Sequence, residues 1–210
     1  MTGAGGGDVG NAGASGADDG VAGGRGNTPA GRRAAVDGGA PGGAQAVAAD
    51  EGAHGPVTLT EPLLEAWGER IGIKAATPLV LALRGQLGAG KSVLARAIAR
   101  GAGVAGHMPS PTFNLLYRYH ARRGIDVVHL DLYRLEDPEE VWELGWAELG
   151  LGDEIVLIEW PERAEALLPE DRWDIWLEIP DEEATVRGVR AARLGAAPAL
   201  PAPPFPGDAA

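Results

Sequence analysis

Residues 79–92 read LVLALRGQLGAGKS, and this stretch decides the fold. Residues 79–83 are apolar without a break, which is typical of a strand buried on both faces of a parallel sheet. Residues 85–92 match the pattern G-x-x-x-x-G-K-[ST]. Residues 94–101 then place apolar side chains at helical spacing and end in a glycine. The stretch therefore predicts a buried strand, a glycine-rich loop and an amphipathic helix, in that order.

A glycine-rich loop between a strand and a helix is the context in which this pattern binds phosphate. Glycines let the backbone curl so that successive N–H groups point at an anion, and the helix N-terminus adds partial positive charge. Lys91, one of two lysines in the chain, is expected to reach the β- and γ-phosphates, and the Ser92 hydroxyl to bind Mg²⁺. An ordinary turn in a glycine-rich chain is the alternative, which the flanking strand and helix disfavour. The predicted nucleotide-binding residues of the loop are Gly85, Leu87, Gly88, Ala89, Gly90, Lys91 and Ser92.

A phosphate loop needs a carboxylate opposite it. Glu159 ends a second apolar run, 155–158, as a Walker B acid does, and we assign it to the metal. Asp131 is the other candidate, because alternation along 126–133 leaves it on one face with His129 and Tyr133. Either acid could instead be an ordinary strand carboxylate, and which of the two orients an attacking water stays open.

Further elements complete the predicted domain. Residues 114–119 and 126–133 predict a hairpin, and residues 137–149 predict a helix. An amphipathic helix is expected over 63–71, and 173–179 reads as the last strand before Pro180. The fold class that follows is an α/β P-loop NTPase, a three-layer mixed sheet with flanking helices and an inserted antiparallel hairpin.

The ends of the chain have a different composition. Residues 1–56 contain no aromatic side chain and are rich in glycine and alanine, so we expect a disordered tail. Residues 57–180 form the predicted ATPase domain. Residues 181–210 are rich in alanine and proline and are expected to be a second, mostly disordered tail.

Charge and composition narrow the function. The net charge of -12 disfavours a direct, strong grip on nucleic acid, so any RNA involved would be held through a partner. Cysteine is absent, which excludes disulfides and thiolate metal sites. No apolar run approaches the roughly 18 residues that span a bilayer. We therefore expect a soluble, cytoplasmic protein.

Four blocks, GQLGAGKS at 85–92, SPTF at 110–113, HLDLYRL at 129–135 and LIEWPE at 157–162, resemble the signatures of the TsaE (YjeE) family in order and spacing. The resemblance covers about residues 57–180. It implies an ATPase subunit of the bacterial machinery that installs threonylcarbamoyl on adenosine 37 of tRNAs decoding ANN codons. ATP and Mg²⁺ are the implied cofactors, and TsaB and TsaD the implied partners, whose turnover the ATPase cycle would support. Contact with tRNA would be indirect.

The resemblance also implies roles for individual residues. Ser92 and Glu159 would serve Mg²⁺, and Asp131 would act near the γ-phosphate. Thr112, which residue spacing also suggests as a switch residue, would be the third catalytic residue. Glu162, together with its neighbour Trp160, would contact nucleotide or partner.

Three other classes use the same loop. A P-loop small-molecule kinase needs an acceptor-binding subdomain and an arginine-bearing lid, for which Arg122 and Arg123 are the candidates. A GTPase needs an N-K-x-D element, and none follows the acidic strand. A non-hydrolysing nucleotide sensor would not need both Asp131 and Glu159.

Overall fold

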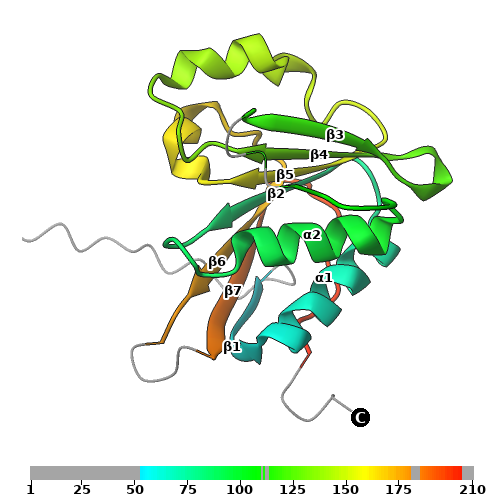
Figure 1. Cartoon of the computed structure of the whole chain (residues 1–210), viewed down its shortest axis with the longest axis vertical. Coiled ribbons are helices and arrows are strands. Elements are labelled where there is room, and N and C mark those ends of the chain that lie inside the picture. Colours follow the sequence, from blue (N-terminus) through cyan, green and yellow to red (C-terminus); the bar gives the residue numbers. More distant parts are fainter. Residues whose placement is uncertain (1–52, 110, 112–113, 181–184, 205–210) are drawn as a thin grey trace, which may run out of the picture. The chain divides into compact units, whose positions relative to one another are not determined.

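The computed structural model describes residues 53–109, 111, 114–180 and 185–204. Within them, seven strands form one mixed sheet in the order β1-β7-β6-β2-β5-β4-β3 (Figure 1). The strands are β1 (Ala53–Thr60), β2 (Leu79–Arg84), β3 (Leu116–His120), β4 (Asp126–Asp131), β5 (Glu154–Glu159), β6 (Arg172–Glu178) and β7 (Val186–Leu194). The helices are α1 (Glu61–Lys74), α2 (Lys91–Ala102) and the 3₁₀ helices η1 (Arg122–Gly124), η2 (Pro138–Leu144), η3 (Trp146–Glu148) and η4 (Pro161–Leu167).

The centre of the sheet is parallel, as the two apolar runs predicted. Strand β2 pairs with β5 on one side and β6 on the other, and β4 runs parallel to β5. Every residue of β5 is buried, and so is every residue of β2 except Arg84. The carboxyl ends of β2, β4 and β5 therefore meet at one edge of the sheet, where the loop 85–92 leaves β2.

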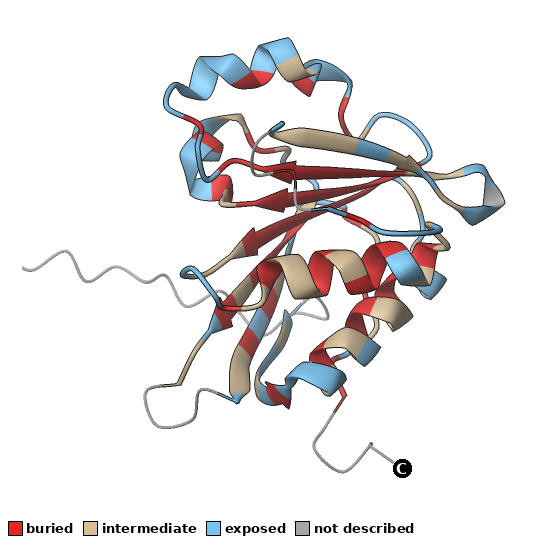
Figure 2. Cartoon of the chain, in the orientation of Figure 1, coloured by how far each residue is buried: buried red, intermediate tan, exposed pale blue. Residues whose placement is uncertain are grey.

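Helices α1 and α2 cover one face of this sheet (Figure 2). Leu81 and Leu83 of β2 belong to the same buried cluster as Trp67 of α1 and Leu94 of α2. The helices pack closely at Gly72, where a Cβ atom would collide with the backbone of α2. Neither α-helix of the described part of the chain is long and apolar enough to cross a membrane.

The opposite face of the central strands carries a second core. Val80 and Val156 pack there with Val141 of η2 and Trp146 of η3. The segment predicted as one helix over 137–149 is instead two 3₁₀ helices, because Gly145 between them adopts a left-handed conformation with φ 77°. Both faces of the parallel strands are thus closed to solvent.

Strands β3 and β4 are antiparallel neighbours at one edge, with Leu116 paired to Leu130. The chain reverses between them through the 3₁₀ helix η1, where Gly124 has a φ of 76°. Because β4 lies between β3 and β5, it is an interior strand, and five of its six residues are buried.

The predicted domain boundary at Pro180 is wrong, and β6 is not the last strand. Strand β7 runs antiparallel to both β6 and β1, so it inserts between them in the sheet. The following segment packs on the domain as well: Ala197 and Leu200 are buried, and the indoles of Trp67 and Trp173 donate hydrogen bonds of 2.8 and 2.7 Å to the carbonyls of Pro201 and Pro198. The N-terminal boundary differs as well, because β1 begins at Ala53, inside the predicted tail 1–56, and pairs with β7. The rest of the predicted disorder, at residues 1–52, 181–184 and 205–210, concerns residues outside the described part of the chain.

Candidate nucleotide-binding site

The loop 85–92 turns sharply between β2 and α2. Gly85, Gly88 and Gly90 all have positive φ angles, of 137, 80 and 102°. At Gly85 a Cβ would also collide with the carbonyl of Leu177, so only glycine fits there. Gly90 is the N-cap of α2, and no side chain caps the helix there. The first amides of α2 are therefore available to an anion.

Lys91 is the first residue of α2, and its side chain folds back into the loop. The Nζ atom donates hydrogen bonds to the carbonyls of Gly85, at 2.6 Å, and Gln86, at 3.0 Å. It also lies 3.7 Å from the centre of the Trp160 ring, a cation–π contact. Burial lowers the pKa of Lys91, and the negative charges of Glu159, Glu162 and Asp131 oppose that shift. The ammonium is held by weak acceptors that an anion could replace.

Two carboxylates face the loop from neighbouring strand ends. Asp131 of β4 pairs with Glu159 of β5 in the parallel register, and both residues are buried, at 4 and 2% exposed. The Ser92 hydroxyl donates a hydrogen bond of 2.8 Å to Glu159 Oε2, so the first turn of α2 is tied to the end of β5. Asp131 Oδ1 accepts a hydrogen bond of 3.1 Å from the amide of Tyr133.

His129 precedes Asp131 by two residues in β4, and its side chain contacts Glu159. It is fully buried in β4, and its Nε2 is 2.8 Å from Glu159 Oε1. Alternation along β4 placed His129 and Asp131 on one face. It did not show the contact with Glu159, because that depends on the register between β4 and β5.

The start of α2 and the two carboxylates line one cavity of about 280 Å³. Of the predicted residues, the cavity brings together Leu87, Gly88, Gly90, Lys91, Ser92, Asp131 and Glu159, and its wall also contains Val93, Tyr133 and Trp160. Tyr133 and Trp160 pack against each other with ring centres 4.9 Å apart. Trp160 holds its ring there from a left-handed backbone conformation with φ 58°, which is unusual for a residue other than glycine.

The remaining predicted residues lie elsewhere. Ala89 is fully buried in the core, and Gly85 lines a neighbouring cavity with Gln86. Glu162 is exposed in η4 and reaches Lys91 only through its charge. Thr112 falls outside the described residues, so its role stays a prediction.

Sequence reasoning missed Arg187, because it lies in the segment assigned to a tail. It stands at the start of β7, and its Nη2 donates a hydrogen bond of 3.3 Å to the carbonyl of Gly88 in the loop. A strand at the antiparallel side of the sheet thus contacts the loop directly. No local motif signals this contact.

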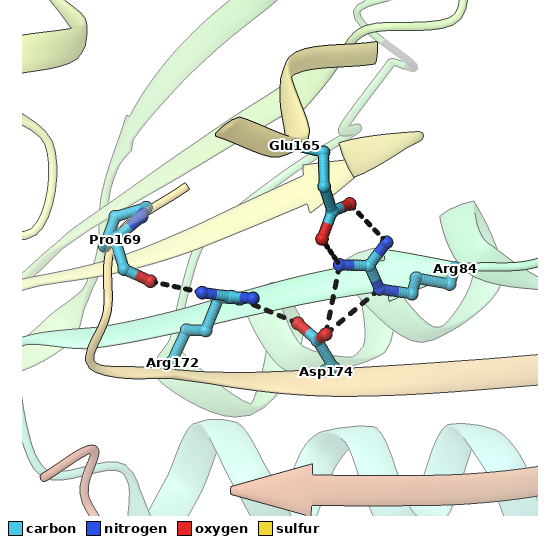
Figure 3. Close-up of polar contacts among 5 residues, drawn as sticks. All are labelled: Arg84, Glu165, Pro169, Arg172 and Asp174. Carbon is cyan, nitrogen blue, oxygen red and sulfur yellow. Dashed lines mark hydrogen bonds and ion pairs between the residues drawn. The ribbon is translucent and has the colours of Figure 1, made fainter. Parts of the chain in front are cut away.

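Arg84, the residue before the loop, is held by an ionic network (Figure 3). Its guanidinium makes two hydrogen bonds to Glu165 of η4, at 2.7 and 2.9 Å, and one of 3.2 Å to Asp174 of β6. Arg172 binds the other oxygen of Asp174 at 2.9 Å. Burial alone would lower the pKa of Arg84, but these carboxylates raise it. The network fixes the strand end from which the loop leaves.

The oxygen donors of the cavity suit a hard cation whose remaining ligands are phosphate and water. Within the described residues, no group of three or more His, Asp or Glu side chains could hold a metal by itself. Ser92 and Glu159 offer two oxygen donors side by side. Mg²⁺ in proteins commonly takes one or two side-chain oxygens and completes its shell with phosphate and water. These two residues fit that pattern.

The fold and the cavity define a class: a mixed α/β protein in which a glycine-rich loop at the start of a helix faces two carboxylates at the ends of parallel strands. Residues 59–188 match the family model described as "Threonylcarbamoyl adenosine biosynthesis protein TsaE". The chain therefore belongs to the TsaE family, which is tied to threonylcarbamoyladenosine biosynthesis in tRNA. The matched range extends past Pro180 into β7.

Individual relatives agree with this assignment. The chain is 36% identical over 117 residues to the tRNA threonylcarbamoyladenosine biosynthesis protein TsaE of Haemophilus influenzae, covering 56% of this chain and 73% of that protein. The TsaE protein of Treponema pallidum is 38% identical over 113 residues, covering 54 and 82%. The crystal structure of YdiB from Bacillus subtilis superimposes with a TM-score of 0.53 at 25% identity, covering 68% of this chain and 89% of that one.

Proposed function

We propose that this chain is a P-loop NTPase that binds ATP with Mg²⁺ at the loop 85–92 and hydrolyses it. One observation carries the proposal: Lys91 and Ser92, at the first turn of α2, share a cavity with Asp131 and Glu159, and Ser92 already bonds Glu159 at 2.8 Å. A phosphate loop, a lysine, a hydroxyl and two acids are the groups that phosphoryl transfer requires.

The position of each residue in the cavity suggests a separate role for it. A triphosphate offers Lys91 charged acceptors, which bind an ammonium more strongly than the two carbonyls that now hold it. Ser92 and Glu159 would hold Mg²⁺, which would supply positive charge against the charge of the phosphates. Because Glu159 accepts a hydrogen bond from Ser92, we assign it to the metal and Asp131 to the γ-phosphate. There Asp131 would orient the attacking water.

In the cell this ATPase would serve the TsaB and TsaD proteins in forming threonylcarbamoyladenosine at position 37 of tRNA. Family membership supports the pathway. The net charge of -12 supports a role in which partner proteins, and not this chain, hold the tRNA.

The position of Arg122 disfavours the kinase alternative. Arg122 lies beside Gly103 at the C-terminal end of α2, whereas the phosphate loop precedes the N-terminal end. The helix has 12 residues, so these ends are about 18 Å apart. An arginine in that position cannot close over the phosphates without a large movement of the turn.

The two lysines of the chain provide the test and its control. Lys91→Ala should weaken ATP binding in calorimetry by about 10- to 100-fold, because a charged hydrogen-bonding group worth roughly 1.5–3 kcal/mol is lost. Lys74→Ala removes the same charge from the exposed end of α1 and should leave affinity unchanged. Equal affinity in both variants would refute the site. Hydrolysis and tRNA modification should then be followed with purified TsaB and TsaD, where Lys91→Ala should be inactive.

A further inference from the structure

His129 is buried at a cost that its place in the core does not explain. Its exposed fraction is 0%, and the residues on either side of it in β4, Val128 and Leu130, are apolar and buried. Among the described residues, the Nδ1 atom of His129 has no hydrogen-bond partner. An unpaired buried polar atom destabilises the folded state, by about 1–3 kcal/mol. A leucine there would avoid this cost.

The other nitrogen of the ring has a partner in the site. Nε2 lies 2.8 Å from Glu159 Oε1, and a carboxylate can only accept hydrogen bonds, so Nε2 carries the proton and donates it. The second oxygen of the same carboxylate accepts from Ser92 at 2.8 Å. Glu159 is therefore held from two sides, by β4 through one oxygen and by α2 through the other.

We propose that His129 is a positioning residue for Glu159. By binding Oε1, it fixes the carboxylate so that Oε2 faces the Ser92 hydroxyl and the cation that this pair would hold. A carboxylate with one oxygen fixed loses less rotational freedom when it binds a metal, and such outer hydrogen-bond partners commonly change metal affinity 10- to 100-fold. The inference rests on the proposed function only in taking Glu159 as the metal-binding acid.

The test uses Mn²⁺ as a spectroscopic probe. The full-length chain is saturated with ADP, and the affinity for Mn²⁺ is measured by electron paramagnetic resonance. His129→Asn shortens the side chain so that its amide does not reach Glu159, whereas the amide nitrogen of His129→Gln reaches about as far as Nε2. We expect Mn²⁺ binding to weaken about 10- to 100-fold in the Asn variant and to stay within about threefold of the wild type in the Gln variant.

Two controls separate this role from a purely structural one. Binding of ADP in the presence of EDTA should be the same in all three proteins, because the phosphate loop is not altered. Thermal unfolding shows whether the Asn variant is folded. If it is not, His129→Leu replaces it, since leucine is of similar size and has no side-chain donor for Glu159.

The outcomes are distinguishable. If the wild type binds neither ADP nor Mn²⁺, the proposed function is wrong. If the wild type binds both, and the Asn or Leu variant binds Mn²⁺ with wild-type affinity, the positioning role alone is wrong. Equal weakening in the Gln and Asn variants also overturns it, because the hydrogen-bond donor would then not be the property that matters.

Discussion

The parallel strands β2, β5 and β4 differ from the antiparallel strands β1 and β7 in what they contribute. The parallel strands end at one edge, where they supply the loop 85–92, Glu159 and Asp131. From the antiparallel pair, Arg187 reaches the loop through a hydrogen bond to the Gly88 carbonyl, whereas Val189 and Ala191 pack in the core. The residues of the candidate site therefore gather where parallel strands end side by side.

The antiparallel pair nevertheless completes the domain. Strand β7 gives hydrogen-bond partners to both β1 and β6, and Val189 and Ala191 add to the core under α1 and α2. The comparison thus predicts that damage to the antiparallel side lowers stability, while damage to the parallel ends lowers activity.

Truncation after Pro180 should have the largest effect. It removes β7 and the segment that covers Trp67 and Trp173, and leaves two strands without their neighbour. Losing several buried apolar side chains, each worth about 1.5–3 kcal/mol, removes most of the 5–15 kcal/mol that stabilises a typical domain. We expect no cooperative unfolding transition by circular dichroism. Truncation after Pro204 is the control, and a truncated chain that unfolds like the full chain would refute this view.

The sequence predicted the parallel side well and the antiparallel side poorly for a physical reason. Strands buried on both faces appear in the sequence as unbroken apolar runs, as in β2 and β5, and the glycine-rich loop 85–92 matches a local pattern. Strand β7 reads VRGVRAARL, with small and charged residues, and its place depends on pairing with β1 more than a hundred residues earlier. Local composition cannot reveal such pairing.

Replacing Glu159 by glutamine should have the opposite effect to the truncation, because it should lower activity and leave stability unchanged. Hydrolysis measured with TsaB and TsaD should fall by about 100-fold, since the acid that we propose to hold the metal is lost, while the fold persists. The unfolding midpoint and ATP affinity should stay close to those of the wild type. Glu162→Gln is the matched control, because this exposed acid lies three residues on and outside the cavity, and its hydrolysis should change by less than about twofold. A larger loss of hydrolysis in Glu162→Gln would support the contact with nucleotide that the family resemblance implied for this residue.

Within the site, sequence identified the groups but not their connections. Lys91, Ser92 and Glu159 follow from motifs. The bond between His129 and Glu159 follows only from the register of β4 against β5, and a one-residue shift would separate the two side chains. The contact from Arg187 needs the path of β7.

A smaller effect concerns Arg84, which joins β2 to β6, the strand where the sheet changes from parallel to antiparallel. The hydrogen bond with Arg84 lowers the pKa of Glu165. The ionised carboxylate therefore adds stability above the pKa of an unfolded glutamate, about 4.3, and this is lost as pH falls through the lowered value. Since Glu165 is 52% exposed, we expect less than about 1 kcal/mol.

Urea unfolding at several pH values measures this contribution. Glu165→Gln should be less stable than the wild type at pH 7, and the difference should shrink steadily as the pH is lowered below the pKa of an unfolded glutamate, about 4.3. The exposed Glu170→Gln variant should show no such trend. A difference that grows on acidification would contradict the assigned sign.

Arg187 gives the finest test of the division between the two sides. Arg187→Ala removes a hydrogen bond of 3.3 Å to the Gly88 carbonyl, worth about 0.5–1 kcal/mol, so ATP binding should weaken about two- to fivefold. Arg190→Ala removes the same charge from the other face of β7, where the guanidinium lies 3.7 Å from the Trp176 ring, and should not change affinity. Calorimetry compares the two variants. Equal losses of ATP affinity in the two variants would mean that overall charge causes the effect. No loss in either would mean that the antiparallel side contributes to stability alone. A loss in Arg187→Ala alone would mean that β7 helps to hold the loop in its binding conformation, because only that arginine contacts the loop.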